Sequence, residues 1–334
     1  MATTAGDATT TMEAIVRDGY GAPDVLKLER IEKPGVSGDE VLVRVQAASL
    51  NAVDWYALTG TPWAGRPSSG LRRPKTGPIG ADVAGTVEAV GKDVTQLRPG
   101  DEVFGRGAGF AEYVVGEAGK LARKPAGTTF EDAAAVPVAG ITALQGLRDH
   151  GGLQPGQRVL VNGASGGVGT FAVQIAKALG AHVTAVCSTG NVELARSLGA
   201  DRVIDYTHED FTRGDERYDV MFDSAGSRSW RACKRVLEPN ATVVLVGGPK
   251  KNRLLGPLGH IGAMKIGSLG GDRKAVFFVA KINQEDLALL GEMLVAGTVR
   301  SVIDRRYPLS ELGDAMRYLG AGHAKGKIVV TVQG

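Results

Sequence analysis

Short apolar runs separated by helical segments dominate the middle of the chain. Val159, Leu160 and Val161 form one such run, which is typical of a parallel strand covered on both faces. Similar runs predict strands over 158–162, 182–187, 202–206, 219–223, 241–246 and 274–280. Six strands with helices between them predict an α/β fold with a doubly wound parallel sheet.

The residues on either side of this region follow another pattern. Residues 12–130 contain frequent Gly and Pro turns, and the segment 40–45 alternates with period two, as half-buried strands do. After residue 275 the pattern predicts mixed structure, with helices over 285–296 and 311–319 and strands over 302–306 and 327–332. The order favours a sheet domain inserted late into a β-rich domain that is built from both flanks.

A glycine-rich turn follows the first predicted strand. Ala164-x-Gly166-x-x-Gly169 matches the dinucleotide fingerprint, with Ala in the place of the first glycine. Gly166 would let the backbone approach a pyrophosphate, and Gly169 would let a helix over 168–179 pack closely against the strand. The alternative is a glycine turn without a ligand. The predicted cofactor contacts in this turn are Ala164, Ser165, Gly166, Gly167 and Val168.

The end of the second strand discriminates between the two nicotinamide cofactors. NAD sites usually carry an acid there, about 20 residues past the fingerprint, which binds the ribose 2′-hydroxyl. No Asp or Glu occurs over 181–192, and small hydroxyl groups would accept a 2′-phosphate. The sequence therefore predicts NADPH; the alternative is that these are ordinary loop residues and both cofactors are used. The predicted contacts at this end are Ser188, Thr189, Tyr206, Lys325 and Lys327.

Composition excludes several classes of protein. The chain has 334 residues, long for a single core, and its formal net charge of +3 is too small to indicate nucleic-acid or membrane binding. Its two cysteines, Cys187 and Cys233, suit a reducing, cytoplasmic environment. The apolar stretch 133–144 is too short to span a bilayer. Residues 1–11 lack the features of a signal peptide and are predicted to form a disordered tail.

Further motifs are shared with a known superfamily. They are Gly80-x-Asp82-x-x-Gly85-x-Val87-x-x-Val90-Gly91, Pro99-Gly-Asp-x-Val-Phe-Gly105, Gly109-Phe-Ala-Glu-Tyr113, Ala134-Ala-Val-Pro137, Thr142-Ala143, the 163–169 turn and Gly322-His-Ala-Lys-Gly-Lys327. With these, nearly all of the chain after Met12 resembles the zinc-independent quinone oxidoreductase branch of the medium-chain dehydrogenase/reductase superfamily. The resemblance implies a GroES-like catalytic domain over 12–137 and 276–334, a Rossmann NADPH-binding domain over 138–275, and an active site in the cleft between them.

The resemblance also has implications for ligands. Where zinc-dependent relatives carry a Cys, a His-Glu pair and a second Cys, this chain has Asn51, Ala81-Asp82 and Val136-Pro137, so we expect no metal. Residues 277–279 would otherwise be an apolar strand in the core or at the edge of a homodimer. By resemblance, further cofactor contacts are expected at Val138, Thr142, Ala225, Val246, Gly247, Phe277, Phe278 and Val279.

Without a metal, the chemistry must suit an acceptor that is already electron-poor. Quinones, and enones or enals at the β-carbon, accept hydride with little activation, and hydrogen-bond donors stabilise the enolate that forms. By resemblance, Asn51 and Asp54 face the cleft, Asn51 as a donor to the substrate carbonyl. Tyr56 and Lys75 are weaker candidates for the acid. The alternatives are that Asn51 caps the following helix and that Asp54 is a helix-capping or ion-paired residue.

The long Pro/Gly-rich segment 61–76 is expected to cover the substrate mouth, with Trp63 and Leu71 as apolar contacts, unless it is only a surface excursion. The sequence thus predicts an NADPH-dependent, zinc-independent oxidoreductase of quinones or α,β-unsaturated carbonyls, with a small-molecule substrate. Two other interpretations stay open. One is a biosynthetic reductase of a single larger conjugated intermediate, and the other is an NADPH-binding regulator with little turnover.

Overall fold

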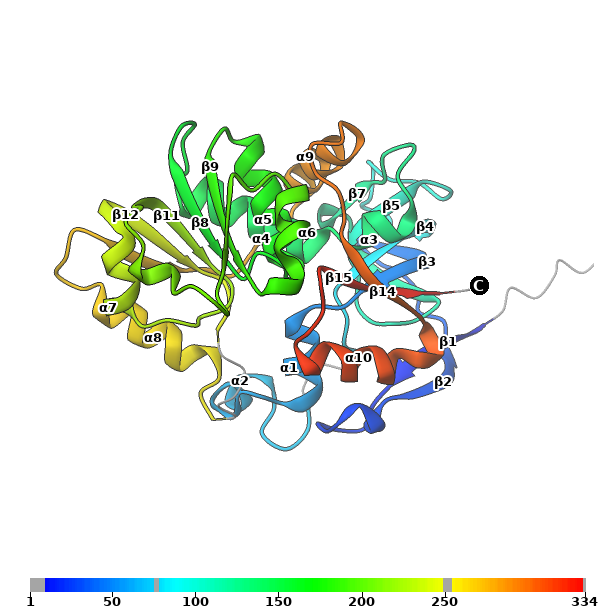
Figure 1. Cartoon of the computed structure of the whole chain (residues 1–334). Helices are drawn as coiled ribbons and strands as arrows, with labels where there is room; N and C mark the ends of the chain where they lie inside the picture. Colours follow the sequence, from blue (N-terminus) through cyan, green and yellow to red (C-terminus); the bar gives the residue numbers. More distant parts are fainter. Residues whose placement is uncertain (1–9, 75–77, 249–253, 333–334) are drawn as a thin grey trace, which may run out of the picture.

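The chain forms two sheet-based parts that lie side by side in the computed structural model, which describes residues 10–74, 78–248 and 254–332 (Figure 1). The first part contains a parallel sheet in the order β10-β9-β8-β11-β12-β13. The strand order reverses between β8 and β11, which confirms the doubly wound fold. Its strands are β8 (Arg158–Asn162), β9 (His182–Cys187), β10 (Arg202–Asp205), β11 (Tyr218–Asp223), β12 (Leu237–Leu245) and β13 (Lys274–Phe277).

Helices cover both faces of this sheet, which explains the continuous apolar runs. Val159 and Val161 pack in the core beneath one set of helices, whereas Leu160 between them packs in the core on the opposite face. The first set is α4 (Pro137–Gln145), α5 (Gly167–Ala178) and α6 (Val192–Ser197). The second set is α7 (Trp230–Cys233) and α8 (Pro257–Gly267). Every position of such a strand is buried, so no polar alternation appears in the sequence.

The second part contains a seven-stranded sheet in the order β14-β15-β3-β4-β5-β7, with β6 paired to β3. Its strands are β3 (Glu40–Ser49), β4 (Asp82–Val90), β5 (Glu102–Arg106), β6 (Tyr113–Glu117), β7 (Leu121–Arg123), β14 (Ile303–Pro308) and β15 (Lys327–Thr331). A separate ribbon pairs β1 (Thr11–Val16) with β2 (Lys27–Glu32). The remaining helices are α1 (Ala52–Thr59), α2 (Arg66–Ser69), α3 (Phe130–Ala134), α9 (Gln284–Val295) and α10 (Leu312–Ala321).

Three elements differ from the sequence prediction for physical reasons. β12 begins earlier than predicted, at Leu237, which already pairs with Tyr218. Residues 238–240 separate Leu237 from the apolar run, so the sequence pattern does not reveal this start. β13 ends at Phe277, because the side chain of the next residue, Phe278, stacks on the ring of His150. α8 was not predicted, since three glycines interrupt its helical pattern. Residues 1–9 of the predicted tail lie outside the described residues, and Thr11 belongs to β1.

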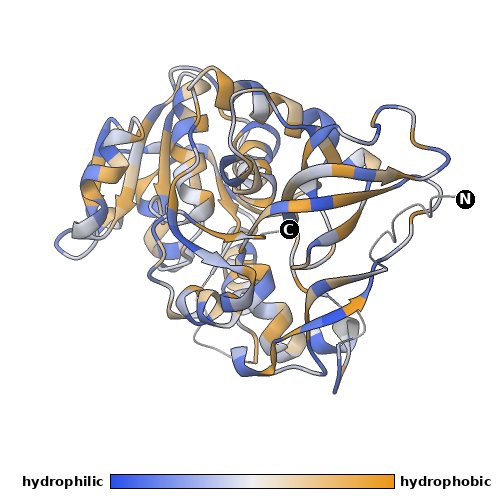
Figure 2. Ribbon diagram, turned by 90° about the vertical axis from the view of Figure 1, so that its right-hand side faces the viewer, coloured by the Kyte–Doolittle hydropathy of each residue, from blue (hydrophilic) through white to orange (hydrophobic). Residues whose placement is uncertain are grey.

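Hydrophobic residues concentrate along the strands and the inner helix faces, while hydrophilic residues dominate the outer turns and helix faces (Figure 2). Two core clusters fill the two faces of the parallel sheet and a third lies within the second part. Of the helices in the described ranges, none is long and apolar enough to cross a bilayer.

The two parts are joined by polar contacts as well as by the chain. Gln174 on α5 donates to the carbonyl of Arg300 (3.0 Å) and accepts from the amide of Arg300 (2.8 Å). Gln145 on α4 makes the same pair of contacts with Lys281, at 2.8 and 3.0 Å. Buried side-chain amides on α4 and α5 thus hold the segment that follows β13, at Lys281 and at Arg300.

Removing the Gln174 amide should therefore loosen the segment after β13 at Arg300. Gln174→Ala leaves two backbone groups of Arg300 without partners, and we expect it to lower the free energy of unfolding by about 1–3 kcal/mol. Urea unfolding at pH 7 measures this. The exposed Gln154→Ala is the matched control, and an equal loss in both variants would contradict the role of the Gln174 contact.

Candidate active site

The glycine turn forms a cradle at the carboxyl end of β8. Gly163 has a positive φ of 86°, and its amide and that of Ala164 donate to the carbonyl of Val186 on β9. A Cβ at Gly169 would lie 2.1 Å from the Gly163 carbonyl oxygen, so the close approach of α5 requires glycine there. The amides of Gly167, Val168 and Gly169 open α5 and have no partners within the helix. This geometry fits the pyrophosphate of a dinucleotide.

The floor of this cradle is a polar contact at the reversal point of the sheet. Asn162, which ends β8, donates its side-chain amide to Asp223 Oδ1 at the end of β11 (2.7 Å). The hydroxyl of Ser224 donates to the Asn162 carbonyl (2.8 Å). Ala225 follows directly, and the carboxyl end of β12, with Val246 and Gly247, lies close, since a Cβ at Gly247 would come 2.2 Å from the Ser224 oxygen. These residues lie at the edge where such sheets bind ligands.

The residues predicted for the adenosine end lie together at the carboxyl end of β9. Thr189 shares a hydrogen bond of 2.9 Å with Thr207, and Ser188 accepts from Asn191 (3.0 Å). Tyr206 is 54% exposed and bonds through its amide to the carbonyl of Cys187. Lys325 reaches the same turn from the C-terminal region, with Nζ 3.4 Å from the Gly190 carbonyl oxygen. A lysine beside two hydroxyl groups forms a suitable environment for a phosphate.

A buried carboxylate, Asp82, lies where three strand ends of the second part meet α4. Its Oδ2 accepts from Ser49 Oγ (2.9 Å), Asn51 Nδ2 (2.8 Å) and Lys327 Nζ (3.2 Å). Its Oδ1 accepts from the amide of Val138 in the first turn of α4 (3.0 Å). Asp82 is fully buried, and four donors satisfy its charge. The sequence analysis did not propose this residue or Ser49 as part of the site.

Asn51 takes part in this cluster and also caps α1. Its side-chain oxygen accepts from Lys327 Nζ (2.6 Å), and its backbone amide donates to Asp54 Oδ2 (2.7 Å). The structure thus shows Asn51 at the N-cap of α1 and Asp54 in its first turn, which are the alternative roles, while both still face the polar cluster. Asn51 keeps 8% of its surface exposed.

The Asp54 carboxyl is poised to titrate near neutrality. Burial raises its pKa to about 7; Asp82 also raises it, while the amide of Asn51 and the ammonium of Lys327 lower it. Tyr56, also on α1, is half-buried, and burial raises the pKa of its phenol. The site therefore holds a carboxyl group that is part protonated at neutral pH.

The placement of Lys327 differs from the prediction of a 2′-phosphate ligand. Its side chain is 2% exposed, and its amine bonds to the Leu50 carbonyl (3.0 Å), Asn51 and Asp82. Only its stem lies beside the glycine turn, since a Cβ at Gly167 would be 3.1 Å from Lys327 Cδ. Lys325 lies in the loop before β15 and Lys327 is the first residue of that strand, so the short spacing of the two lysines does not place both at one site.

Other predicted residues are distributed around this centre. Thr142 donates its hydroxyl to the Val138 carbonyl (2.6 Å) on α4. Phe278 stacks on His150 with ring centroids 4.1 Å apart, and together with Val279 it lines a surface hollow of about 680 Å³ bounded by α4 and α9. Phe277 is 37% exposed. The backbone contacts of Phe277, Phe278 and Val279 with the cofactor stay a prediction.

The segment 61–76 extends from α1 toward the cofactor part. Trp63 and Leu71 are 50% and 69% exposed, and the amide of Ala64 donates to the carbonyl of Leu254, just before α8 (3.0 Å). This contact connects the two parts beside the site, as a covering segment would. Lys75 and Thr76 lie outside the described residues.

The donor set does not fit a catalytic zinc ion. The positions that correspond by resemblance to the zinc ligands hold Asn51, Ala81-Asp82 and Val136-Pro137, and the carboxylate of Asp82 already has four donors. Across residues 10–74, 78–248 and 254–332, His, Cys, Asp and Glu form no group of three able to hold a metal ion. No step of the chemistry is assigned to a metal here.

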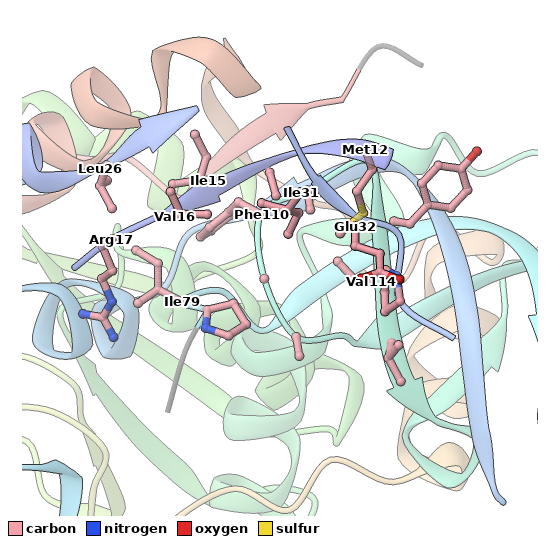
Figure 3. Close-up of a pocket in the computed structure, with 18 residues that line it drawn as sticks. Met12, Ile15, Val16, Arg17, Leu26, Ile31, Glu32, Ile79, Phe110 and Val114 are labelled. Atoms are coloured by element: carbon pink, nitrogen blue, oxygen red, sulfur yellow. The ribbon is translucent and has the colours of Figure 1, made fainter. Parts of the chain in front are cut away.

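An apolar pocket of about 460 Å³ lies elsewhere, between the β1–β2 ribbon and the loops 78–79 and 108–111 (Figure 3). Met12, Ile15, Ile79 and Phe110 line it, with Arg17 at one end. None of the polar residues around Asp82 is among its lining residues. This pocket is therefore separate from the polar cluster around Asp82.

Titration of Asp54 should make stability depend on pH. Its folded pKa lies above the ordinary value, so the folded state binds more protons between pH 4 and 7 and loses stability as pH rises through this range. In Asp54→Asn the side chain cannot ionise, so the folded state does not lose this stability as pH rises. We expect the stability of Asp54→Asn relative to wild type to increase between pH 4.5 and 8 by roughly 2–4 kcal/mol in urea unfolding. The exposed Asp18→Asn should show no such trend; a flat difference for Asp54→Asn would contradict the prediction.

Comparison with known proteins agrees with this geometry. Residues 37–145 match the family model of the alcohol dehydrogenase GroES-like domain, and residues 198–330 match that of the zinc-binding dehydrogenases. A 2-methylene-furan-3-one reductase of Solanum lycopersicum is 36% identical over 96% of this chain and 79% of its own length. The chloroplastic quinone-oxidoreductase QR1 of Triphysaria versicolor is 33% identical over 96% of this chain and 98% of its own.

A solved structure also shows the same fold over nearly the whole chain. The solved structure of the quinone oxidoreductase from Coxiella burnetii covers 97% of this chain and 100% of its own with a TM-score of 0.84 and 31% identity. Relatives named as NAD(P)H or NADPH-dependent oxidoreductases match along nearly the whole chain. The chain therefore belongs to the medium-chain dehydrogenase/reductase superfamily, in its quinone oxidoreductase branch, and is an oxidoreductase that uses a nicotinamide cofactor.

Proposed function

We propose that this enzyme uses NADPH to reduce quinones or α,β-unsaturated carbonyls, without a metal, at the polar cluster around Asn51. One observation carries the proposal. The side-chain amide of Asn51 lies at the junction of the two parts, and one of its two N–H protons has no acceptor among the described residues. Its Nδ2 has two protons, and Asp82 accepts one of them (2.8 Å). The second is available to an acceptor carbonyl oxygen.

The chemistry follows from this donor. The cofactor, when bound along the glycine turn, supplies the hydride; the protein supplies position and stabilises charge. As hydride reaches the β-carbon of an enone, or a carbon or oxygen of a quinone, negative charge grows on the carbonyl oxygen. An Asn51 N–H aimed at that oxygen stabilises the developing enolate.

Two protonated groups of α1 differ in whether they can supply the proton that completes the reduction. The Asp54 carboxyl, with its pKa of about 7, holds a proton for part of the time at neutral pH, and it contacts the Asn51 backbone. The Tyr56 phenol lies on the same helix and remains protonated at neutral pH. Tyr56 or a water molecule would deliver the proton, because Asp54 is 3% exposed and its Oδ2 already accepts a hydrogen bond.

NADPH is preferred to NADH because of the groups at the end of β9. Ser188 and Thr189 offer hydroxyls, Lys325 offers a positive charge beside Gly190, and Tyr206 offers an exposed ring to the adenosine. The nearest strand-end acid, Asp205, already accepts from the amide and hydroxyl of Thr207. The hydroxyl of Thr189 also bonds to the Asp205 side chain and lowers its pKa, so this carboxylate borders the turn, although residues 188–190 themselves include no acid.

Two further proposals accompany this function. The free edge of β13 in the parallel sheet would pair with a second copy in a homodimer. The protein would work in the cytoplasm, where its two buried free cysteines would stay reduced.

Steady-state reduction of a panel of ortho- and para-quinones, enones, enals and simple ketones, with product identification, tests the function. We expect turnover of quinones or enones and none of simple ketones, and Asn51→Ala should lower kcat by about 100-fold or more. Thermal unfolding of Asn51→Ala controls for its capping role. Tight NADPH binding with no turnover of any acceptor would overturn the proposal in favour of a regulator, and turnover of one large conjugated substrate alone would favour a biosynthetic reductase.

Cofactor choice has its own test. Ser188→Asp places a carboxylate where the 2′-phosphate would lie, and we expect it to lower kcat/KM for NADPH by about 10- to 100-fold while NADH is little affected. The matched control is Ser188→Ala, which removes the hydroxyl without adding charge. An Asp variant that lowers kcat/KM equally for both cofactors would show that this turn does not contact the 2′-phosphate.

A further inference from the structure

The Lys327 ammonium has no proton to spare. Its three acceptors are Asn51 Oδ1 (2.6 Å), the Leu50 carbonyl (3.0 Å) and Asp82 Oδ2 (3.2 Å), and an ammonium group has three protons. With its side chain 2% exposed, it cannot exchange one of these partners for water. Lys327 is therefore an anchor at this site and not a proton donor to substrate.

This anchor determines which way the Asn51 amide faces. The oxygen of the amide accepts from Lys327, and its nitrogen donates to Asp82. A flipped amide would set its NH₂ against the ammonium and its oxygen against the carboxylate, so the pair of charges excludes that state. The free amide proton consequently has a single direction for as long as the Lys327 charge is in place.

The other end of the same residue lies on the glycine turn. The amide of Gly326 donates to the Ser165 carbonyl (2.8 Å), and Gly326 forms a parallel bridge with Gly166. The Lys327 side chain then crosses Gly167, where a Cβ would come 3.1 Å from Cδ and 3.4 Å from the Gly326 oxygen. One residue thus contacts the turn that would hold the pyrophosphate and the amide that would meet the acceptor.

We propose that Lys327 is a positioning residue that couples occupation of the glycine turn to the orientation of the Asn51 amide. A dinucleotide that fixes the turn would also fix the Gly326–Lys327 backbone, which is hydrogen-bonded to it, and so hold the ammonium on the Asn51 amide. The proposal rests on the proposed role of Asn51 as the acceptor's hydrogen-bond donor. It gives Lys327 a different role from its neighbour Lys325, which lies at the 188–190 turn.

Side-chain NMR tests the coupling without any turnover. The chain holds six asparagines, so selective ¹⁵N-asparagine labelling gives few side-chain signals, and Asn51→Ala assigns the signal of interest. NADP⁺ is the probe. In the wild type we expect it to shift the amide signals of both Asn51 and Asn162, the latter from the floor of the cradle. In Lys327→Met, which keeps the length of the stem and removes the charge, Asn162 should still respond and Asn51 should not.

Two further variants keep the test decisive if Lys327→Met does not fold. Gly167→Ala displaces the lysine stem while its charge stays in place, and it should reduce the Asn51 response to saturating NADP⁺. Lys325→Met should weaken NADP⁺ binding and leave the Asn51 response at saturation intact. An unchanged Asn51 response in Lys327→Met or Gly167→Ala would overturn the coupling, and so would loss of NADP⁺ binding in Lys327→Met, which would make it a phosphate ligand.

Kinetics provides the second readout. Lys327→Met should lower kcat for acceptor reduction by about 10- to 100-fold while KM for NADPH changes less than threefold, because charge-assisted hydrogen bonds to Asn51 are lost and the stem is kept. If the wild type reduces no acceptor, the proposed function fails, and the NMR response still decides whether the coupling exists.

Discussion

The junction of the two parts depends on one buried carboxylate, that of Asp82. It begins a strand, accepts from side chains on two others, and accepts the first-turn amide of α4, so a single negative charge fixes four elements at one point. A buried charge is tolerated only where donors replace the lost water, and here one donor is the Lys327 ammonium. Loss of either partner would strand the other, a situation that typically costs about 3–5 kcal/mol. The cluster therefore constrains stability and site geometry together.

Different groups of residues are proposed to recognise the cofactor and to orient the acceptor. In the proposed function, the cofactor is chosen at the end of β9, by Ser188, Thr189 and Lys325. The acceptor would be oriented at a different place, by the polar cluster around Asn51. Because the glycine turn lies between the two regions and contacts the second through Gly326 and the Lys327 stem, the two regions share few contacts.

Local pattern predicted the strands and helices of both parts well and the members of the polar cluster poorly. Strands such as 158–162 and 182–187 coincide with β8 and β9, and the glycine turn has the expected form, because apolar runs and φ-permissive residues are local signals. The polar cluster is not local. Ser49 faces Asp82 only through the register of β3 with β4, and Lys327 joins them only because β15 pairs with β3. A strand register of this kind leaves no trace in the spacing of the residues, so Lys327 was read as a phosphate ligand.

The path of the chain through the second sheet has a consequence for biosynthesis. β3 and β4 are made before the parallel sheet, whereas β15 follows it, so the ribosome releases Lys327 after nearly all other parts of the site. Until then Asp82 and the Asn51 amide lack their cation, although the parallel sheet already has its complete set of strands. A nascent chain would complete the strands of the parallel sheet first and the polar cluster around Asp82 last.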